Sequence, residues 1–346
     1  MKLTRHELTL LFNALYEAGV DRVTVAHPCE AIGDLLEIEL GDPRASEVRF
    51  TQGALTYADN RATVRRRHGD AADDLPDAQH YVDATIAGGV TDVANQDEIA
   101  AFVDRYGYPD LAAGHHPVFA GIDTNLFPWR IQTAIGIDPE TGPIDDADRP
   151  PTNGYALATG VKAELDWHYK HYDTHHLVEA FGPAFDRVSD QPAGPNRQGF
   201  LGLYEYRRLM AERRVDVVDT GTGDDAIVEG YADYAADRRV TPLLFSNDYG
   251  FVEQATDAGL HAHHVDIPVD LPRSTTASWS AIEDMLYYLA VAFGVLTLPK
   301  VTVYGVWDGK TGRDWQTECL DIDPRSPAVE ATLERDKSIV ATTVPE

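Results

Sequence analysis

The sequence predicts an α/β protein with a large three-layer α/β/α domain, whose sheet is mostly parallel, preceded by a smaller α+β domain. From Pro117 onward, short apolar runs alternate with helical patterns, the order expected for a parallel sheet covered on both faces. Before that point, strand and helix patterns are mixed without this alternation. The chain has 346 residues, enough for two domains. We therefore expect an N-terminal domain in residues 1–115, a second domain in residues 117–322 and an extended tail in residues 323–346.

The N-terminal part begins with an amphipathic helix in residues 1–20, whose charged side chains distinguish it from a signal peptide. Two strands follow in "RVTVAH" and "LLEIEL", and the segment "NQDEIAAFVDRYG" has helical spacing. The basic run "RATVRRRHG" at residues 61–69 is interpreted as a solvated strand edge, with nucleic-acid contact as the alternative.

The C-terminal part contains four short apolar runs with the length and composition of strands. They span residues 118–122, 215–219, 241–246 and 261–267. Helical spacing predicts helices in residues 153–172, 224–237, 249–259 and 280–294. A hairpin is expected in residues 300–322, and Pro/Gly/Asp-rich composition predicts long loops in residues 138–154 and 190–199. The apolar run 285–298 is shorter than the ~20 residues of a membrane-spanning helix.

The charge is strongly acidic, with 57 Asp and Glu against 29 Lys and Arg and a formal net charge of −28. This composition, spread over the whole chain, resembles proteins of halophilic microbes. In molar salt the Debye length shrinks to about 3 Å, so the charge does not exclude a nucleic-acid partner. The two cysteines, Cys29 and Cys319, are too few for a disulfide framework. We expect a cytoplasmic protein that does not bind membranes.

Acidic residues follow the predicted strands, where ligands bind in open α/β sheets. Asp123 follows the strand 118–122, Asp248 follows the strand 241–246, and Asp224 and Asp225 open the helix after residues 215–219. Glu164 lies inside a predicted helix between apolar neighbours, where an unpaired charge is costly. Clustered carboxylates repel one another, and Mg²⁺ or Mn²⁺ would relieve that repulsion. Such an ion activates water and stabilises charge on a phosphodiester, so the pattern predicts metal-assisted phosphodiester hydrolysis.

The motifs "IDTN", "KAEL", "DDAIV" and "FSNDYGF", in this order, resemble the PIN-domain nucleases over residues 117 to about 310. The resemblance implies catalytic metal ligands at Asp123, Glu164, Asp225 and Asp248, with Asp224 as an alternative to its neighbour. It also implies that Asn125 and Ser246 orient these ligands through hydrogen bonds. The implied cofactor is Mg²⁺ or Mn²⁺, and the implied partner is nucleic acid, with RNA expected. A homodimer is possible on the same resemblance. The N-terminal domain and the long loops depart from single-domain members of the family.

Three other interpretations stay open. Asp219-Thr220-Gly221 resembles the active-site turn of retroviral-type aspartic proteases, although that fold is all-β and the sequence has no second Asp-Thr-Gly. A PIN-like fold could also serve as a non-catalytic RNA-binding or scaffold module. Two histidine groups could bind zinc but are better explained as a helix face and a strand. These groups are His168, His171 and His175, and His261, His263 and His264.

Aromatic and basic side chains near these motifs could contact nucleic acid. Phe127, Trp129 and Tyr249 could stack on bases, or they could belong to the core. Basic residues that could contact phosphates are Arg130, Lys162, Arg197, Arg207, Arg208 and Arg273. The sequence does not single out one of these basic residues.

Overall fold

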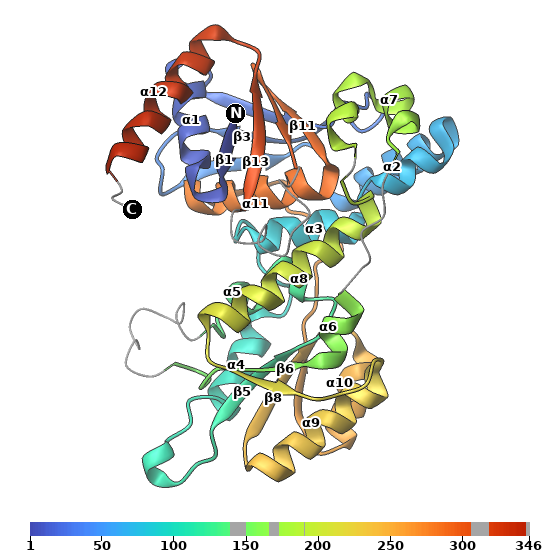
Figure 1. Cartoon of the computed structure of the whole chain (residues 1–346), viewed down its shortest axis with the longest axis vertical. Coiled ribbons are helices and arrows are strands. Elements are labelled where there is room, and N and C mark those ends of the chain that lie inside the picture. The colour runs from blue at the N-terminus through green and yellow to red at the C-terminus, as the bar shows by residue number, and fades with distance from the viewer. Residues whose placement is uncertain (139–149, 166–172, 190, 306–317, 344–346) are drawn as a thin grey trace. The chain divides into compact units, whose positions relative to one another are not determined.

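The computed structural model describes residues 1–138, 150–165, 173–189, 191–305 and 318–343 (Figure 1). The chain forms two compact units, each assembled from separate stretches. Unit 1 comprises Met1–Thr91, Tyr169–Arg197 and Val269–Glu346, and unit 2 comprises Asp92–His168 and Gln198–Pro268. The expected division into contiguous domains at residue 115 is therefore wrong, because Val269–Glu346 belongs to the same unit as Met1–Thr91.

Unit 1 contains an eight-stranded sheet in the order β1-β13-β12-β11-β2-β3-β4-β10, in which every neighbouring pair is antiparallel. Its strands are β1 (Lys2–Thr4), β2 (Arg22–Ala26), β3 (Asp34–Glu39), β4 (Ser46–Phe50), β10 (Ser274–Ala277), β11 (Val295–Leu298), β12 (Val301–Tyr304) and β13 (Cys319–Pro324). Strands from both ends of the chain pair with each other, and β11 adds to β2 through Thr297 and Ala26. This pairing protects the edge of β2, which would otherwise expose backbone donors and acceptors.

Helices pack against this sheet and against one another. They are α1 (Leu8–Glu17), α2 (Ala54–His68), α3 (Ala78–Ala87), α7 (His175–Phe181), α11 (Trp279–Phe293) and α12 (Pro327–Thr343), with short 3₁₀ helices at Arg5–Glu7, Gly69–Asp74 and Pro183–Val188. The almost wholly buried α11 contacts β11 and α3, and α12 packs against α1 and β13. The expected tail is therefore wrong, since its described residues continue β13 and form α12.

The basic run at residues 61–69 also differs from the expectation. It lies largely in α2, a helix, and not on a strand edge. Tyr57 and Val64 bury one side of this helix, whereas Arg65 and Arg66 are exposed. The segment has few apolar residues, so its sequence carries only a weak signal of helical periodicity.

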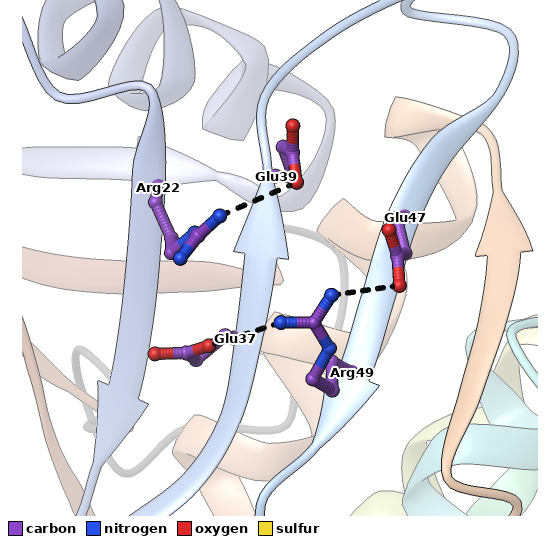
Figure 2. A pocket seen from close by; sticks show the side chains of 5 residues that line it. All are labelled: Arg22, Glu37, Glu39, Glu47 and Arg49. Atoms are coloured by element: carbon purple, nitrogen blue, oxygen red, sulfur yellow. Dashed lines mark hydrogen bonds and ion pairs between the residues drawn. The ribbon is translucent and has the colours of Figure 1, made fainter.

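The exposed side of β2, β3 and β4 holds a ladder of charged side chains (Figure 2). Arg49 lies between two acidic partners, 3.9 Å from Glu37 and 3.1 Å from Glu47. Arg22 is 3.6 Å from Glu39, directly across the strand pair. The small depression between them, of about 10 Å³, has room for about one water molecule. We interpret this ladder as a solvated sheet face and not as a ligand site.

Unit 2 contains a five-stranded, wholly parallel sheet in the order β7-β6-β5-β8-β9. Its strands are β5 (Val118–Ile122), β6 (Tyr155–Ala158), β7 (Val215–Val218), β8 (Thr241–Ser246) and β9 (His261–His264). The parallel α/β character predicted from the sequence is confirmed. The helix expected over residues 153–172 is wrong at its start, where β6 lies between β5 and β7 with all four residues buried. A short run buried on both faces does not reveal by periodicity whether it is a strand or a helix.

Helices cover both faces of the parallel sheet. They are α4 (Gln96–Tyr106), α5 (Ile131–Ala134), α6 (Thr159–Leu165), α8 (Gly194–Glu212), α9 (Asp224–Arg238) and α10 (Tyr249–Asp257), with short 3₁₀ helices at Leu111–Ala113 and Phe127–Trp129. Gly121 of β5 pairs with Leu244 of β8, and Tyr231 of α9 packs on the face of the sheet where these two residues meet. Phe245, which follows Leu244 in β8, contacts Phe102 of α4. Because successive side chains of a strand point to opposite faces, α9 and α4 cover different faces.

Helix α8 begins in unit 1 and continues in unit 2. It occupies much of the loop expected in residues 190–199, so that expectation is wrong from Gly194 onward. Within the described residues, no helix is long and apolar enough to cross a membrane.

Candidate active site

The candidate site lies at the carboxyl edge of the parallel sheet, where the strand order reverses. The chain adds β6 and β7 on one side of β5, and then β8 and β9 on the other. Such a reversal leaves a crevice between the two central strands, here β5 and β8, in which open α/β sheets bind ligands. Asp123 directly follows β5, Ser246 ends β8, and Asp248 is the N-cap residue of α10.

Asp123 is buried, with only 6% of its surface exposed. Its two carboxylate oxygens accept hydrogen bonds from the Ser246 hydroxyl and from the backbone N–H of Thr124, each at 2.7 Å. The Ser246 oxygen in turn accepts the backbone N–H of Asp248 at 2.9 Å. Ser246 therefore links the ends of the two central strands and fixes the orientation of Asp123.

Glu164, half-buried on α6, joins two further segments to this edge. One of its oxygens accepts the Thr124 hydroxyl, and the other accepts the backbone N–H of Gly223 at 2.8 Å. Gly223 immediately precedes α9 and has a φ of +85°, in the left-handed region that glycine adopts without strain. The carboxylate of Glu164 thus connects the end of β5 to the start of α9.

The turn that contains Asp219-Thr220-Gly221 packs closely on the start of α6. The Thr159 hydroxyl donates a hydrogen bond to the carbonyl oxygen of Thr220 at 3.1 Å. The backbone N–H of Gly160 donates to the Thr220 hydroxyl oxygen at 2.9 Å. A Cβ on Gly160 would lie 2.0 Å from the carbonyl oxygen of Gly221, so only glycine permits this approach. The turn connects a parallel strand to a helix, a setting unlike the all-β turn of an aspartic protease.

The carboxyl groups at this edge act on one another electrostatically. Burial raises the pKa of Asp123 to about 6, and the negative charges of Asp224 and Glu164 add to this effect. Burial also raises the pKa of Asp224, with further contributions from Asp248, Glu164 and Asp225. Four segments of unit 2 therefore bring acidic side chains within electrostatic range of one another, and this proximity contributes to the raised pKa of Asp123 and of Asp224.

The two residues of the Asp224-Asp225 doublet lie in different environments. Asp224 is half-buried and close enough to Asp248 and Glu164 for their charges to raise its pKa. Asp225 is exposed to solvent. We therefore place Asp224, and not its neighbour, in the carboxylate cluster formed with Asp123, Glu164 and Asp248.

The cluster has the donor chemistry of a hard divalent cation, since Mg²⁺ and Mn²⁺ prefer carboxylate oxygens. In the part of the chain that the structure describes, no three acidic, histidine or cysteine side chains are grouped so that they could hold a metal ion. Glu164 and Asp248 instead accept backbone hydrogen bonds from Gly223 and Gly250, at 2.8 and 2.7 Å. The donor type therefore fits the ion, and each of these two carboxylates keeps acceptor sites beyond the one used by its backbone partner.

Some predicted neighbours of the cluster have other roles. Asn125 is exposed, and the group that holds the second oxygen of Asp123 is the backbone of Thr124. The hydrogen bonds of Thr124 and Gly223 to these carboxylates were not predicted from the sequence. A hydroxyl residue directly after the strand-ending aspartate and a glycine directly before a helix were the available signals.

Three of the six basic residues considered as phosphate contacts form ion pairs with buried carboxylates. Arg130 and Arg208 both pair with the buried Glu205, at 2.8 and 2.7 Å. Arg197 is buried in unit 1 against Asp74. These arginines stabilise the interior of their units, whereas Lys162 is exposed on α6 near Glu164.

The histidines of β9 are each stacked on an aromatic ring. His261 lies on Tyr106, His263 on Phe102 and His264 on Tyr249, with ring centroids 4.0, 4.9 and 3.6 Å apart. His175 belongs to unit 1, and His168 and His171 lie outside the described residues. The β9 histidines are thus accounted for by aromatic packing.

Comparison with protein-family models, curated proteins and solved structures finds no match to this chain. The interpretation of the site therefore depends on the fold and on the geometry described above.

Proposed function

We propose that unit 2 is a Mg²⁺- or Mn²⁺-dependent nuclease that hydrolyses RNA, as the PIN-domain resemblance implies. The observation that supports this proposal is the meeting of Asp123, Glu164, Asp224 and Asp248, from four segments, at the strand-order reversal of a parallel sheet. Placing like charges beside the buried carboxylate of Asp123 is costly, and a bound cation would compensate that cost.

The residues of the chain have distinct parts in this proposal. Asp123, Glu164, Asp224 and Asp248 would hold the cation, and Ser246 and Thr124 keep the carboxylate of Asp123 oriented. Bound there, Mg²⁺ or Mn²⁺ would supply an activated water and stabilise negative charge on the phosphodiester. The buried position of Asp123 excludes bulk water from its side of the site.

The test uses the full chain in high-salt buffer with end-labelled RNA and single-stranded DNA, in the presence of Mn²⁺, Mg²⁺ or EDTA. We expect metal-dependent cleavage of RNA that falls by at least about 100-fold in Asp123→Asn and Asp224→Asn. Asp225→Asn is the matched control, one residue along and exposed, and should retain cleavage within about threefold of wild type. Asp219→Asn serves as the control for the aspartic-protease interpretation.

Cleavage that survives EDTA, or that is unchanged in Asp123→Asn, contradicts the proposal. A second candidate is a non-catalytic RNA-binding module. Glu164 and Asp248 accept hydrogen bonds from the backbone N–H groups of Gly223 and Gly250. These bonds give the two carboxylates a structural role, which favours the non-catalytic function. RNA binding without cleavage, equal in wild type and both active-site variants, would support this second candidate.

A further inference from the structure

Tyr249 is an exposed aromatic residue beside the carboxylate cluster. Of the three aromatic residues considered for base stacking, Phe127 and Trp129 are buried, at 1% and 2% exposure, whereas Tyr249 is 70% exposed. Tyr249 directly follows Asp248 and is the first residue of α10. The burial of the other two assigns them to the core and leaves Tyr249 as the candidate for ligand contact.

The ring of Tyr249 is held in place by His264. The two rings are almost parallel, with an interplanar angle of 8° and centroids 3.6 Å apart. The Nε2–H of His264 donates to the carbonyl oxygen of Asn247 at 3.1 Å, which fixes the plane of the imidazole. Since one face of the tyrosine ring is covered and the side chain is largely exposed, its other face is open to solvent. A ring already held in position loses little conformational entropy on binding a ligand.

The stack stands at the same edge of the sheet as the acidic cluster. Strands β8 and β9 are parallel neighbours, and Ser246 and His264 are paired in register. Ser246 is the residue whose hydroxyl bonds Asp123, and its oxygen accepts the N–H of Asp248. A ligand on the open face of Tyr249 therefore lies beside the carboxylates and not at the opposite end of the strands.

We propose that the Tyr249–His264 stack is a binding subsite for one nucleobase of single-stranded RNA next to the cleaved phosphodiester. The proposal rests on the proposed function. With a net charge of −28, the protein as a whole repels a polyanion, whereas stacking on an aromatic ring does not depend on the sign of the charge. Stacking tolerates any base, so the subsite contributes affinity and position without sequence preference.

The experiment measures binding of a short RNA that carries 2-aminopurine, and of the matching DNA, in EDTA so that no cleavage occurs. We expect quenching of 2-aminopurine fluorescence by wild type. In Tyr249→Ala, we expect loss of quenching and a Kd weaker by about 5- to 150-fold. Tyr249→Phe keeps the ring and should bind within about twofold of wild type, because stacking does not use the hydroxyl. Tyr16→Ala, which removes an exposed tyrosine of unit 1, is the matched control and should leave binding unchanged.

The outcomes separate this inference from the proposed function. Base stacking at Tyr249 without any metal-dependent cleavage would support the subsite and contradict the nuclease. Cleavage with an unchanged KM in Tyr249→Ala, together with unchanged Kd and quenching, would overturn the subsite and leave the nuclease standing. Equal loss of binding in Tyr249→Phe and Tyr249→Ala would also overturn it, because the ring would then not be the group that binds.

Discussion

Two buried aspartates, one in each unit, differ in the charges around them. Asp74 of unit 1 is 1% exposed and binds Arg197 through both carboxylate oxygens, at 3.0 and 3.1 Å. Asp123 of unit 2 is 6% exposed, and the charged groups that act on it are the carboxylates of Asp224 and Glu164. Buried charges are ordinarily paired, so Asp74 has a structural environment, whereas Asp123 has one that favours binding a cation.

A raised pKa alone does not make this distinction. In unit 1, burial raises the pKa of Asp83 and of Glu283 to about 7 in each case. Their hydrogen-bond partners are neutral side chains, Gln79 for Asp83 and Thr9 for Glu283. What sets Asp123 apart is that acids from several segments meet around it at the carboxyl edge of the sheet. The comparison teaches that clustering, and not burial, marks the candidate site.

The largest expected effect is the loss of the buried ion pair in unit 1. Asp74→Asn should lower the free energy of unfolding by about 3–5 kcal/mol, because it leaves the buried guanidinium of Arg197 without a counter-charge. Chemical denaturation followed by circular dichroism measures the change. Asp73→Asn is the matched control, since the neighbouring Asp73 pairs with Arg65 at the surface, and it should change the free energy of unfolding far less than Asp74→Asn does.

The double variant Asp74→Asn/Arg197→Met sharpens this prediction. It removes both charges and should recover much of the lost stability, because no unpaired ion remains buried. Equal stability of Asp74→Asn and Asp73→Asn would show that the two environments do not differ as described.

The second expected effect is a gain in the free energy of unfolding, produced by Asp123→Asn, and its size depends on pH. The folded state raises the pKa of Asp123 to about 6, so the folded state binds the proton more tightly than the unfolded chain. Wild-type stability therefore falls as the pH rises from about 4 to about 6, and this loss persists above that range. Asp123→Asn carries no such charge and should be more stable than wild type by about 1–3 kcal/mol at neutral pH.

Thermal unfolding in EDTA at several pH values measures the difference between wild type and Asp123→Asn. The extra stability of Asp123→Asn should vanish below about pH 4, where the carboxyl of wild-type Asp123 is protonated in both the folded and the unfolded state. A variant that is less stable than wild type at every pH would contradict the assignment of Asp123 as a carboxyl in an unfavourable charge environment.

The smallest effect concerns the exposed ladder of unit 1 (Figure 2). Arg22 and Glu39 are 3.6 Å apart and more than half exposed, at 54% and 55%. A double-mutant cycle with Arg22→Ala and Glu39→Ala should give a coupling below about 1 kcal/mol that decreases with added salt. A larger coupling that is insensitive to salt would mean that this face is shielded from solvent.

The sequence predicted those strands and helices of unit 2 that have a clear pattern of apolar residues within their own segment. Strands β5, β7 and β8 are short apolar runs, and α9 and α10 follow them with helical spacing, so their positions agree with the expectation. The same alternation led to the expectation that acidic side chains lie at one edge of a parallel sheet. The catalytic role of Asp123, Glu164 and Asp248 stays a prediction, as does the identity of the metal and of the nucleic acid.

The sequence by itself determined the parallel sheet of unit 2 and the presence of acids after its central strands, because periodicity and strand ends are properties of neighbouring residues. Only the tertiary structure decided that β11 pairs with β2, and that β6 is a strand and not the start of a helix. It also decided that Asp224 is half-buried within electrostatic range of Asp248 and Glu164, whereas Asp225 is exposed. These outcomes depend on contacts between residues far apart in the chain, whose pairing no local pattern encodes.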